Sequence, residues 1–238
     1  MVGIGPGNLE QMSFKAHRTV READVIIGYK TYVDLIRELI DNQEVIDSGM
    51  TREVERSLLA IDKALTGAKV AIISSGDAGI YGMAGIVLEL VVKGGHDLEV
   101  EIIPGISSAN AAAASLGAPL MHDFVTISLS DLLTPWEVIE KRLHFAAQGD
   151  FVVNLYNPMS KKRTEQIKIA RDIMLRYKAG ETPVGIVRNA KRGDEVITIT
   201  TLEKMLDHPI DMFSVIIIGN SETFSSGGFM ITPRGYKV

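Results

Sequence analysis

Cysteine is absent from this chain of 238 residues. Its absence excludes disulfide bonds, zinc–thiolate sites, iron–sulfur clusters and a cysteine nucleophile. A long hydrophobic run is also lacking, because no apolar stretch approaches the ~20 residues that a membrane-spanning helix needs. The first residues contain neither the charged nor the apolar region of a secretion signal. We therefore expect a cytoplasmic protein with no segment in a membrane.

Positive charge is in the minority, with 25 lysine and arginine residues against 30 aspartate and glutamate residues and a net charge of -5. The two signs are mixed along the chain, so a nucleic acid is a poor candidate partner. A local basic cluster is still able to bind a small anionic ligand. Hydrophobic residues make up 46% of the chain, enough to form the core of one large domain or two modest ones.

Recognisable catalytic and metal-binding motifs are lacking as well. The histidines have no i, i+4 pair of the kind that forms a helical metal site, so we expect no metal; they are His17, His96, His122, His144 and His208. No G-x-S-x-G motif supplies a hydrolase nucleophile. The sequence therefore assigns no catalytic residue, and suits a cofactor that brings its own reactivity while the protein orients the reactants.

Short apolar runs alternate with amphipathic helical stretches along the whole chain, which predicts α/β structure with mainly parallel sheets. Gly117 and Pro119 interrupt the alternation and suggest a hinge. We expect two α/β domains, residues 1–118 and 119–238. The expected strands are 1–5, 24–29, 68–74, 98–105, 123–131, 150–158, 183–190, 195–202 and 213–220. The expected helices are 13–23, 32–40, 53–67, 80–95, 107–117, 136–147, 164–178 and a short one at 202–206, with a hairpin or lid at 227–236.

Small and polar residues follow four of the expected strands, at 3–8 (GIGPGN), 74–82 (SSGDAGIYG), 104–108 (PGISS) and 155–158 (LYNP). In open parallel sheets, ligands bind outside the carboxyl ends of the strands. Small side chains also let backbone amides and carbonyls approach a flat ligand closely. The four loops together therefore predict one binding cleft.

Each loop also has a plainer interpretation. The loop 3–8 has Asn8 where the dinucleotide fingerprint needs a glycine and lacks the lysine of a phosphate-binding P-loop, so it is either a ligand-facing turn or a structural one. Asp77 is a candidate N-cap for a helix that begins near Ile80, and Ser107 or Ser108 for the helix after it.

Five stretches taken together, 3–7, 74–82, 104–120, 155–158 and 183–190, resemble the tetrapyrrole methylase family of class III methyltransferases over nearly the whole chain. The resemblance implies that S-adenosylmethionine binds in a cleft between the two domains and leaves as S-adenosylhomocysteine. It also implies a homodimer. The cofactor contacts that it implies are Pro6, Ser75, Gly76, Asp77, Ile80, Ser107, Ser108, Asn157, Asn189, Ala190 and Gly219. Ala78 departs from the usual Gly-Asp-Pro loop, which costs rigidity rather than a contact.

Within the family, residues 48–57, 155–167, 216–223 and 230–236 resemble the group that methylates C17 of precorrin-3B or cobalt-factor III and contracts the ring in cobalamin biosynthesis. The resemblance does not separate the oxygen-dependent pathway from the cobalt-first pathway. Two alternatives stay open: methylation of another tetrapyrrole position or another acceptor, such as rRNA or a diphthamide precursor, and a tetrapyrrole-binding protein without catalysis.

Basic residues in the loops agree with a tetrapyrrole substrate, whose rim carries carboxylates that guanidinium groups bind well. The expected substrate contacts are Arg52, Lys161, Arg163, Arg188 and Arg234, with Lys162, Lys191 and Arg192 nearby. For Lys161 and Lys162, a solvated helix start is an equal alternative. The acid or base for ring contraction is unassigned, with Asp123, His122 and Glu195 as candidates.

Overall fold

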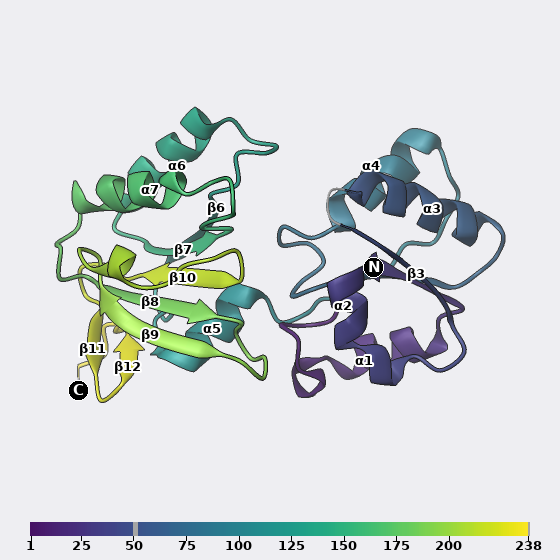
Figure 1. Ribbon diagram of the computed structural model, residues 1–238, viewed down its shortest axis with the longest axis horizontal. Coiled ribbons are helices and arrows are strands. Elements are labelled where there is room, and N and C mark those ends of the chain that lie inside the picture. Colours follow the sequence, from purple (N-terminus) through teal and green to yellow (C-terminus); the bar gives the residue numbers. More distant parts are fainter. Residues whose placement is uncertain (50–51, 238) are drawn as a thin grey trace. The chain divides into compact units, whose positions relative to one another are not determined.

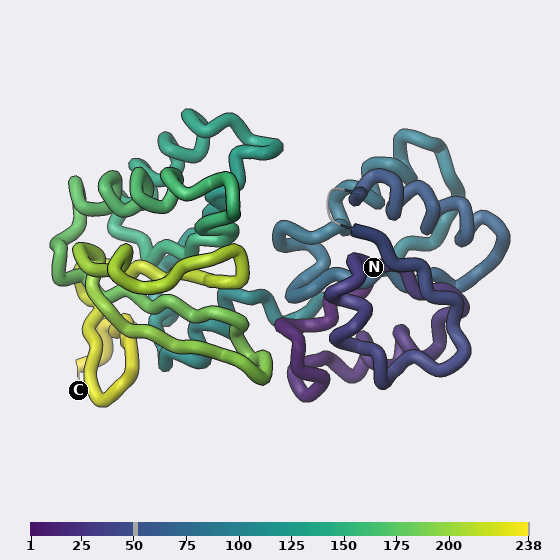
Figure 2. The backbone as a smooth tube through the Cα atoms, in the orientation of Figure 1, coloured from purple at the N-terminus to yellow at the C-terminus, as the bar shows by residue number. Residues whose placement is uncertain are grey.

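The computed structural model describes residues 1–49 and 52–237. Residues 50 and 51 belong to the stretch 48–57 that resembles the C17-methylating group, and this part of the resemblance lies outside the described residues. The chain divides into two compact units, Met1–Ser108 and Ala109–Val238 (Figure 1; Figure 2 traces the same path as a tube). Each unit combines a β sheet with helices, which confirms the prediction of α/β structure.

The first unit is built on a four-stranded sheet in which all neighbouring strands are parallel, in the order β1-β4-β2-β3. The strands are β1 (Val2–Gly3), β2 (Val25–Tyr29), β3 (Glu44–Ser48) and β4 (Val70–Ser74). The helices are α1 (Phe14–Glu22), α2 (Lys30–Leu35), α3 (Glu53–Leu65) and α4 (Ala84–Gly94), with 3-10 turns η1 (Leu9–Gln11) and η2 (Arg37–Leu39).

Helices cover both faces of this sheet. On one face, Val20 of α1 packs in a buried cluster with Ile26 and Ile73 of the central strands. On the other face, Ile61 of α3 and residues of α4 pack in a second cluster with Ile27. Figure 1 shows α3 and α4 on one side of the first unit and α1 and α2 on the other. Because both faces are buried, β2 and β4 are runs of consecutive apolar residues rather than alternating ones.

Three local expectations for the first unit need correction. The strand expected at 98–105 is reduced to a single bridge between Ile103 and Val2, because the alternating charged residues before it leave it no second buried face. The helix expected from 80 begins at Ala84, after a series of bends. Strand β3, which the sequence analysis did not find, is a partly exposed edge strand without an apolar run.

The second unit contains a five-stranded sheet in the order β6-β7-β10-β8-β9 and a small sheet in the order β11-β12-β5. The strands are β5 (Gly117–Ala118), β6 (Phe124–Ser128), β7 (Val152–Tyr156), β8 (Pro183–Arg188), β9 (Val196–Thr201), β10 (Ser214–Ile218), β11 (Phe224–Ser226) and β12 (Phe229–Ile231). The helices are α5 (Ser108–Leu116), α6 (Trp136–Gln148) and α7 (Glu165–Leu175), with the 3-10 turn η3 (Met205–Asp207).

Strand direction in this larger sheet differs from the expectation. Strands β6 and β7 are parallel, whereas β10 is antiparallel to both β7 and β8, and β9 is antiparallel to β8. The prediction of a mainly parallel sheet is therefore correct for the first unit and wrong for the second. Helices α6 and α7 cover one face of the sheet, and α5 covers the other (Figure 1).

Helix α5 falls with the second unit, so the division lies after Ser108 rather than after residue 118 as expected. Its alanines and Leu116 belong to a buried cluster with Val187 and Ile217 of the sheet. A Cβ added to Gly185 would lie 2.3 Å from a methyl of Leu116, so the helix and strand β8 are in close contact. Small residues in a helix allow such a close approach to a sheet. The expected boundary was drawn from Gly117 and Pro119, which do not show the sheet on which the helix packs.

The last strands, β11 and β12, form a hairpin at 224–231, so it begins before the hairpin or lid that the sequence predicted at 227–236. Gly227 and Gly228 occupy the turn between β11 and β12, and both have a positive φ (58° and 81°). Two consecutive positive φ angles are typical of the tight turns that match the twist of a two-stranded ribbon. Among the described residues, no helix combines the length and the apolar character needed to cross a bilayer.

Candidate functional site

Three loops of the first unit meet at the carboxyl edge of its sheet. The loop after β1 and the loop after β4 are joined by a pair of backbone hydrogen bonds, from Gly5 N to Gly76 O (3.1 Å) and from Gly76 N to Gly5 O (2.7 Å). The N–H of Gly3 donates to the carbonyl of Ile103 (2.9 Å), which brings in the segment that precedes α5. The three loops are therefore one assembly, as the sequence analysis expected for this half of the chain.

Glycines occupy the centre of the assembly because no side chain fits there. A Cβ added to Gly105 would lie 2.1 Å from the carbonyl oxygen of Gly76 and 2.8 Å from the carbonyl of Gly3. A Cβ added to Gly3 would lie 2.7 Å from the amide nitrogen of Gly105. We call Gly3, Gly76 and Gly105 the glycine cluster. The sequence analysis named Gly76 alone as a contact, although Gly3 and Gly105 belong to two of the other loops that it marked, 3–8 and 104–108.

Asp77 ties two of the loops together. Its Oδ1 accepts a hydrogen bond from Gly79 N (2.8 Å) and its Oδ2 accepts one from Gly105 N (3.0 Å). The N-cap of α4 is Met83, which makes no side-chain cap hydrogen bond, so Asp77 does not cap this helix. The capping alternative is thus wrong, and the carboxylate holds the glycine cluster in place.

The other predicted contacts in the first unit lie around the glycine cluster. Pro6 is buried directly after Gly5, and Ser75 is half-buried directly before Gly76. Ser107 is buried, and its Cα lies 3.7 Å from the position of a Cβ on Gly76; Ser108, the first residue of α5, lies as close. The side chain of Ile80 is exposed. The structure therefore brings the predicted cofactor residues of this unit to one edge.

In the second unit, Asn157 follows β7, and Asn189 and Ala190 follow β8. Strands β7 and β8 are both antiparallel to β10, which lies between them, so their carboxyl ends lie at the same edge of the sheet. Two strand spacings separate these ends by about 10 Å. Asn157 and Asn189 have positive φ angles (50° and 52°), which asparagine tolerates well. Their amides donate to Ser128 Oγ (2.9 Å) and Asp194 Oδ2 (2.7 Å).

Gly219 lies at the opposite edge of the same sheet. It follows β10, and its N–H donates to the carbonyl of Pro183, the first residue of β8 (2.9 Å). The structure therefore does not bring Gly219 together with Asn157 and Asn189. The physical reason is the antiparallel direction of β10, which the sequence analysis did not foresee.

Arg163 and Arg188, two of the four predicted substrate-binding arginines, each have more than one partner within the chain. Arg188 Nε donates to Asp211 Oδ2 (2.7 Å), which raises the pKa of Arg188, and its Nη1 lies 3.6 Å from Asp194. Arg163 Nη1 donates to Leu129 O (2.9 Å), and its side chain is only 12% exposed. Burial lowers the pKa of Arg163. A substrate carboxylate would have to compete with these contacts.

The other predicted basic residues and the acid–base candidates are more exposed. Lys161 is at the surface, the Arg234 guanidinium donates to Met121 O (3.3 Å), and Arg52 pairs with Glu55 (3.2 Å). Asp123 is exposed, and its N–H donates to His122 Nδ1 (2.8 Å).

Glu195 Oε1 accepts hydrogen bonds from Ser115 Oγ (2.6 Å) and Lys191 N (2.8 Å), so it joins α5 to the loop after β8. It lies in a different loop from the pair His122 and Asp123. Nothing in the structure assigns the acid or base for ring contraction to any of the three.

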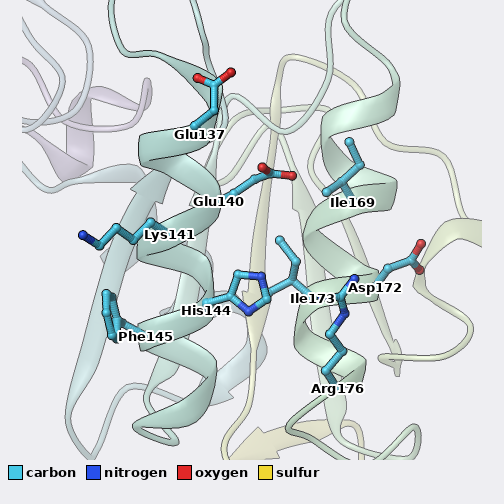
Figure 3. A pocket seen from close by; sticks show the side chains of 9 residues that line it. All are labelled: Glu137, Glu140, Lys141, His144, Phe145, Ile169, Asp172, Ile173 and Arg176. Carbon is cyan, nitrogen blue, oxygen red and sulfur yellow. The ribbon is translucent and has the colours of Figure 1, made fainter.

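Two hollows in the described surface are lined by other residues. Figure 3 shows one, a groove of about 640 Å³ between α6 and α7, in which Glu140 and His144 point toward α7. His144 Nδ1 lies 3.1 Å from Tyr177 OH. The other hollow, of about 620 Å³, is lined by the first residues of β4 and by α3, at the amino edge of the first sheet. No predicted site residue lines either hollow. Within the described part of the chain, no group of three or more histidine or carboxylate side chains is placed to hold a metal.

The fold and these loops define an α/β protein whose candidate binding loops lie at the carboxyl edge of a parallel sheet. Comparison with known proteins gives the family: residues 1–206 match the model of the Tetrapyrrole (Corrin/Porphyrin) Methylases. The chain therefore belongs to the tetrapyrrole methylase family, as its loops indicated.

Three similar proteins are informative. A protein of Priestia megaterium named cobalt-factor III methyltransferase is 52% identical over the whole chain, which spans 45% of that protein's length. A protein of Salmonella typhimurium named probable cobalt-factor III C(17)-methyltransferase is 51% identical, with 100% of this chain and 99% of that one covered. The crystal structure of the methyltransferase CobJ is 33% identical, with a TM-score of 0.91 and 98% of both chains covered.

Proposed function

We propose that this protein transfers a methyl group from S-adenosylmethionine to C17 of a cobalt-factor III type tetrapyrrole, with contraction of the ring, in cobalamin biosynthesis. The observation that carries the proposal is the glycine cluster braced by Asp77, in a chain that shares half its residues with the full length of the Salmonella relative. The proposal includes a homodimer and a cytoplasmic location, which the family resemblance implies.

The residues around the glycine cluster fit such a cofactor. The glycines and Ala78 leave the backbone at residues 75–79 without bulky side chains, so its polar groups suit the amino-acid part of the ligand. Ser75 directly precedes Gly76, and Ser108 Oγ lies 3.7 Å from the position of a Cβ on Gly76. When bound, S-adenosylmethionine supplies a methyl group on a positively charged sulfur. The predicted placement of the cofactor between the two units stays part of the proposal.

The chain's own contribution is orientation. Methyl transfer is an in-line displacement, so its rate depends on holding the acceptor carbon in line with the methyl group more than on a strong base. Asp77 holds the loops after β4 and before α5 in one arrangement through Gly79 and Gly105. Lys161 and Arg234, which are exposed, remain proposed partners for the substrate's carboxylates.

The test is incubation of the purified protein with S-adenosylmethionine and either cobalt-factor III or precorrin-3B, followed by mass spectrometry and absorbance spectroscopy. We expect a ring-contracted product that has gained one methyl group. Because both named relatives above carry cobalt-factor III in their names, we expect kcat/KM for cobalt-factor III to exceed that for precorrin-3B by about tenfold or more. Tight tetrapyrrole binding without turnover of either substrate would instead favour a carrier.

A further inference from the structure

Tyr81 has a backbone conformation that a tyrosine rarely adopts. It lies in the loop between β4 and α4, and its φ is 52°. The other non-glycine residues with positive φ in the described chain are Asp150, Asn157, Asn189 and Lys191. Three of these are aspartate or asparagine, whose short polar side chains make this region accessible, whereas an aromatic side chain makes it costly. Tyr81 is thus in a strained position that glycine would occupy freely.

The surrounding loop imposes this conformation. The N–H of Ala84 donates back to the carbonyl of Ala78 (2.9 Å), so residues 78–84 form a closed turn with Tyr81 at its far end. A Cβ added to Gly82 would lie 2.4 Å from Ala78 O and 2.7 Å from Ser74 Oγ. The turn is therefore compact on its inner side, and its outer residues have little freedom to relax.

Core packing does not explain the choice of tyrosine, because Tyr81 is 57% exposed. Its neighbour Ile80 is exposed too, and so is Ile106, which follows Gly105 of the glycine cluster. The first unit therefore presents three large apolar side chains beside its candidate cofactor loops. Backbone strain at an exposed residue of a binding loop is typical of a side chain kept for its contact with a ligand.

We propose that Tyr81 is a substrate-contacting residue whose ring packs against the face of the tetrapyrrole. This inference rests on the proposed function and adds to it a substrate contact that the proposed function did not include. A tetrapyrrole is a flat conjugated plate, which an aromatic ring stacks against and which the exposed Ile106 complements with apolar surface. Tyr81 is not among the proposed cofactor contacts, so the two ligands are distinguishable by experiment.

The test compares Tyr81→Gly, Tyr81→Phe and the wild type. Glycine relieves the strain, so we expect the melting temperature of Tyr81→Gly to be equal to or above that of the wild type. We expect its KM for cobalt-factor III to rise about tenfold or more, with the Kd for S-adenosylhomocysteine changed by less than about twofold. Tyr81→Phe keeps the ring and should retain most of the substrate affinity.

Phe145→Ala is the matched control, because Phe145 is 61% exposed and lines the groove between α6 and α7, which no predicted site residue lines. We expect it to leave KM unchanged. A lower melting temperature for Tyr81→Gly with an unchanged KM would overturn the inference and make Tyr81 structural. Weaker binding of S-adenosylhomocysteine with an unchanged KM would overturn it as well, in favour of a cofactor contact.

Failure of the proposed function is a separate outcome. If the wild type turned over neither tetrapyrrole, the binding of cobalt-factor III measured by fluorescence quenching would still compare Tyr81→Gly with the wild type. Equal binding by the two would overturn the inference, and binding weakened about tenfold in the variant would support it as a binding contact alone.

Discussion

Gly105 is a position at which a single methyl group cannot be accommodated. The nearest atom to an added Cβ is the carbonyl oxygen of Gly76 at 2.1 Å, and two backbone hydrogen bonds to Gly5 hold Gly76 in place. We expect Gly105→Ala to lower the free energy of unfolding by about 2 kcal/mol or more, as overpacking does, and to abolish cofactor binding. Urea unfolding and calorimetric titration with S-adenosylhomocysteine measure the two effects.

Gly85→Ala is the control for that substitution. Gly85 lies in α4 with no atom within 4 Å of an added Cβ. Alanine favours a helix more than glycine, so we expect Gly85→Ala to raise stability by up to about 1 kcal/mol. Equal changes in unfolding free energy for Gly105→Ala and Gly85→Ala would contradict the steric explanation of the glycine cluster.

Removing the Asp77 carboxylate tests the link between the loops and the cofactor. We expect Asp77→Ala to weaken binding of S-adenosylhomocysteine about tenfold or more, because the N–H groups of Gly79 and Gly105 lose their acceptor. The fold should survive, since the carboxylate lies at the surface edge of the sheet and outside its core. Asp77→Asn keeps one oxygen acceptor, so its affinity for S-adenosylhomocysteine should lie between those of the wild type and Asp77→Ala. Unchanged affinity together with a large loss of melting temperature would show that Asp77 has a structural role alone.

At the scale of single residues, the sequence located the loops that meet better than it showed how their residues contact one another. The run 74–79 indicated that Asp77 is either a site residue or a helix cap, because a helix cap and a loop brace have the same local pattern. The partner that decides between them, Gly105, is 28 residues away in sequence. The φ angle of Tyr81 is likewise invisible in the sequence, because it results from the closed turn between Ala78 and Ala84.

Strands β7 and β10 of the second unit are tied to the segment after α7 by one charged cluster. Lys178, whose side chain is 2% exposed, donates to Asp150 Oδ1 and to Phe151 O (both 3.0 Å). Asp150 also accepts hydrogen bonds from the N–H (3.0 Å) and hydroxyl (2.6 Å) of Ser221. Burial raises the pKa of Asp150, but the hydrogen bonds from Ser221 and Lys178 outweigh it, so the pKa is lower than the usual value.

The sign of this shift gives a pH dependence. A carboxyl whose pKa is lower in the folded state stabilises the fold above its unfolded-state pKa of about 3.9, and this contribution is lost as the pH falls through the lower value. We expect Asp150→Asn to be less stable than the wild type at about pH 7 and the difference to shrink below about pH 4. Asparagine tolerates the positive φ of residue 150, so the backbone is preserved. A difference in unfolding free energy that is constant with pH would contradict this account.

Helices and strands with a clear apolar pattern could be predicted from the sequence. The directions of the strands and the exact ends of the elements were harder to predict. Helices α6 and α7 begin within a residue of the expected positions because their apolar spacing is clear. The direction of β10 was not predictable, since its buried run of valine and isoleucines fits a parallel or an antiparallel neighbour equally well. This one direction separates Gly219 from Asn157 and Asn189.

Each unit has a hydrophobic interior of its own. Two buried clusters consist of residues from the first unit, and two others consist of residues from the second. We expect Leu143→Ala, in α6, to cost about 2 to 5 kcal/mol and to speed amide hydrogen exchange in residues 109–238 while leaving 1–108 nearly unchanged. Ile61→Ala, in α3, should produce the reverse pattern. Mass spectrometry of exchanged peptides measures both, and a uniform increase along the chain would contradict separate interiors.

For the whole molecule, alternating strands and helices were enough to predict two α/β halves. The position of the boundary between the two halves was harder to predict. The alanine-rich helix α5 follows the loops of the first unit in sequence but packs on the sheet of the second. The helix's small residues carry no indication of which sheet they face.

The brace that Asp77 provides means that the loops beside the glycine cluster already have their final arrangement before any ligand arrives. Binding to such a preorganised surface loses little conformational entropy, so most of the contact energy remains available as affinity. If the proposed cofactor binds at these loops, we expect simple one-step association rather than a slow rearrangement of disordered chain.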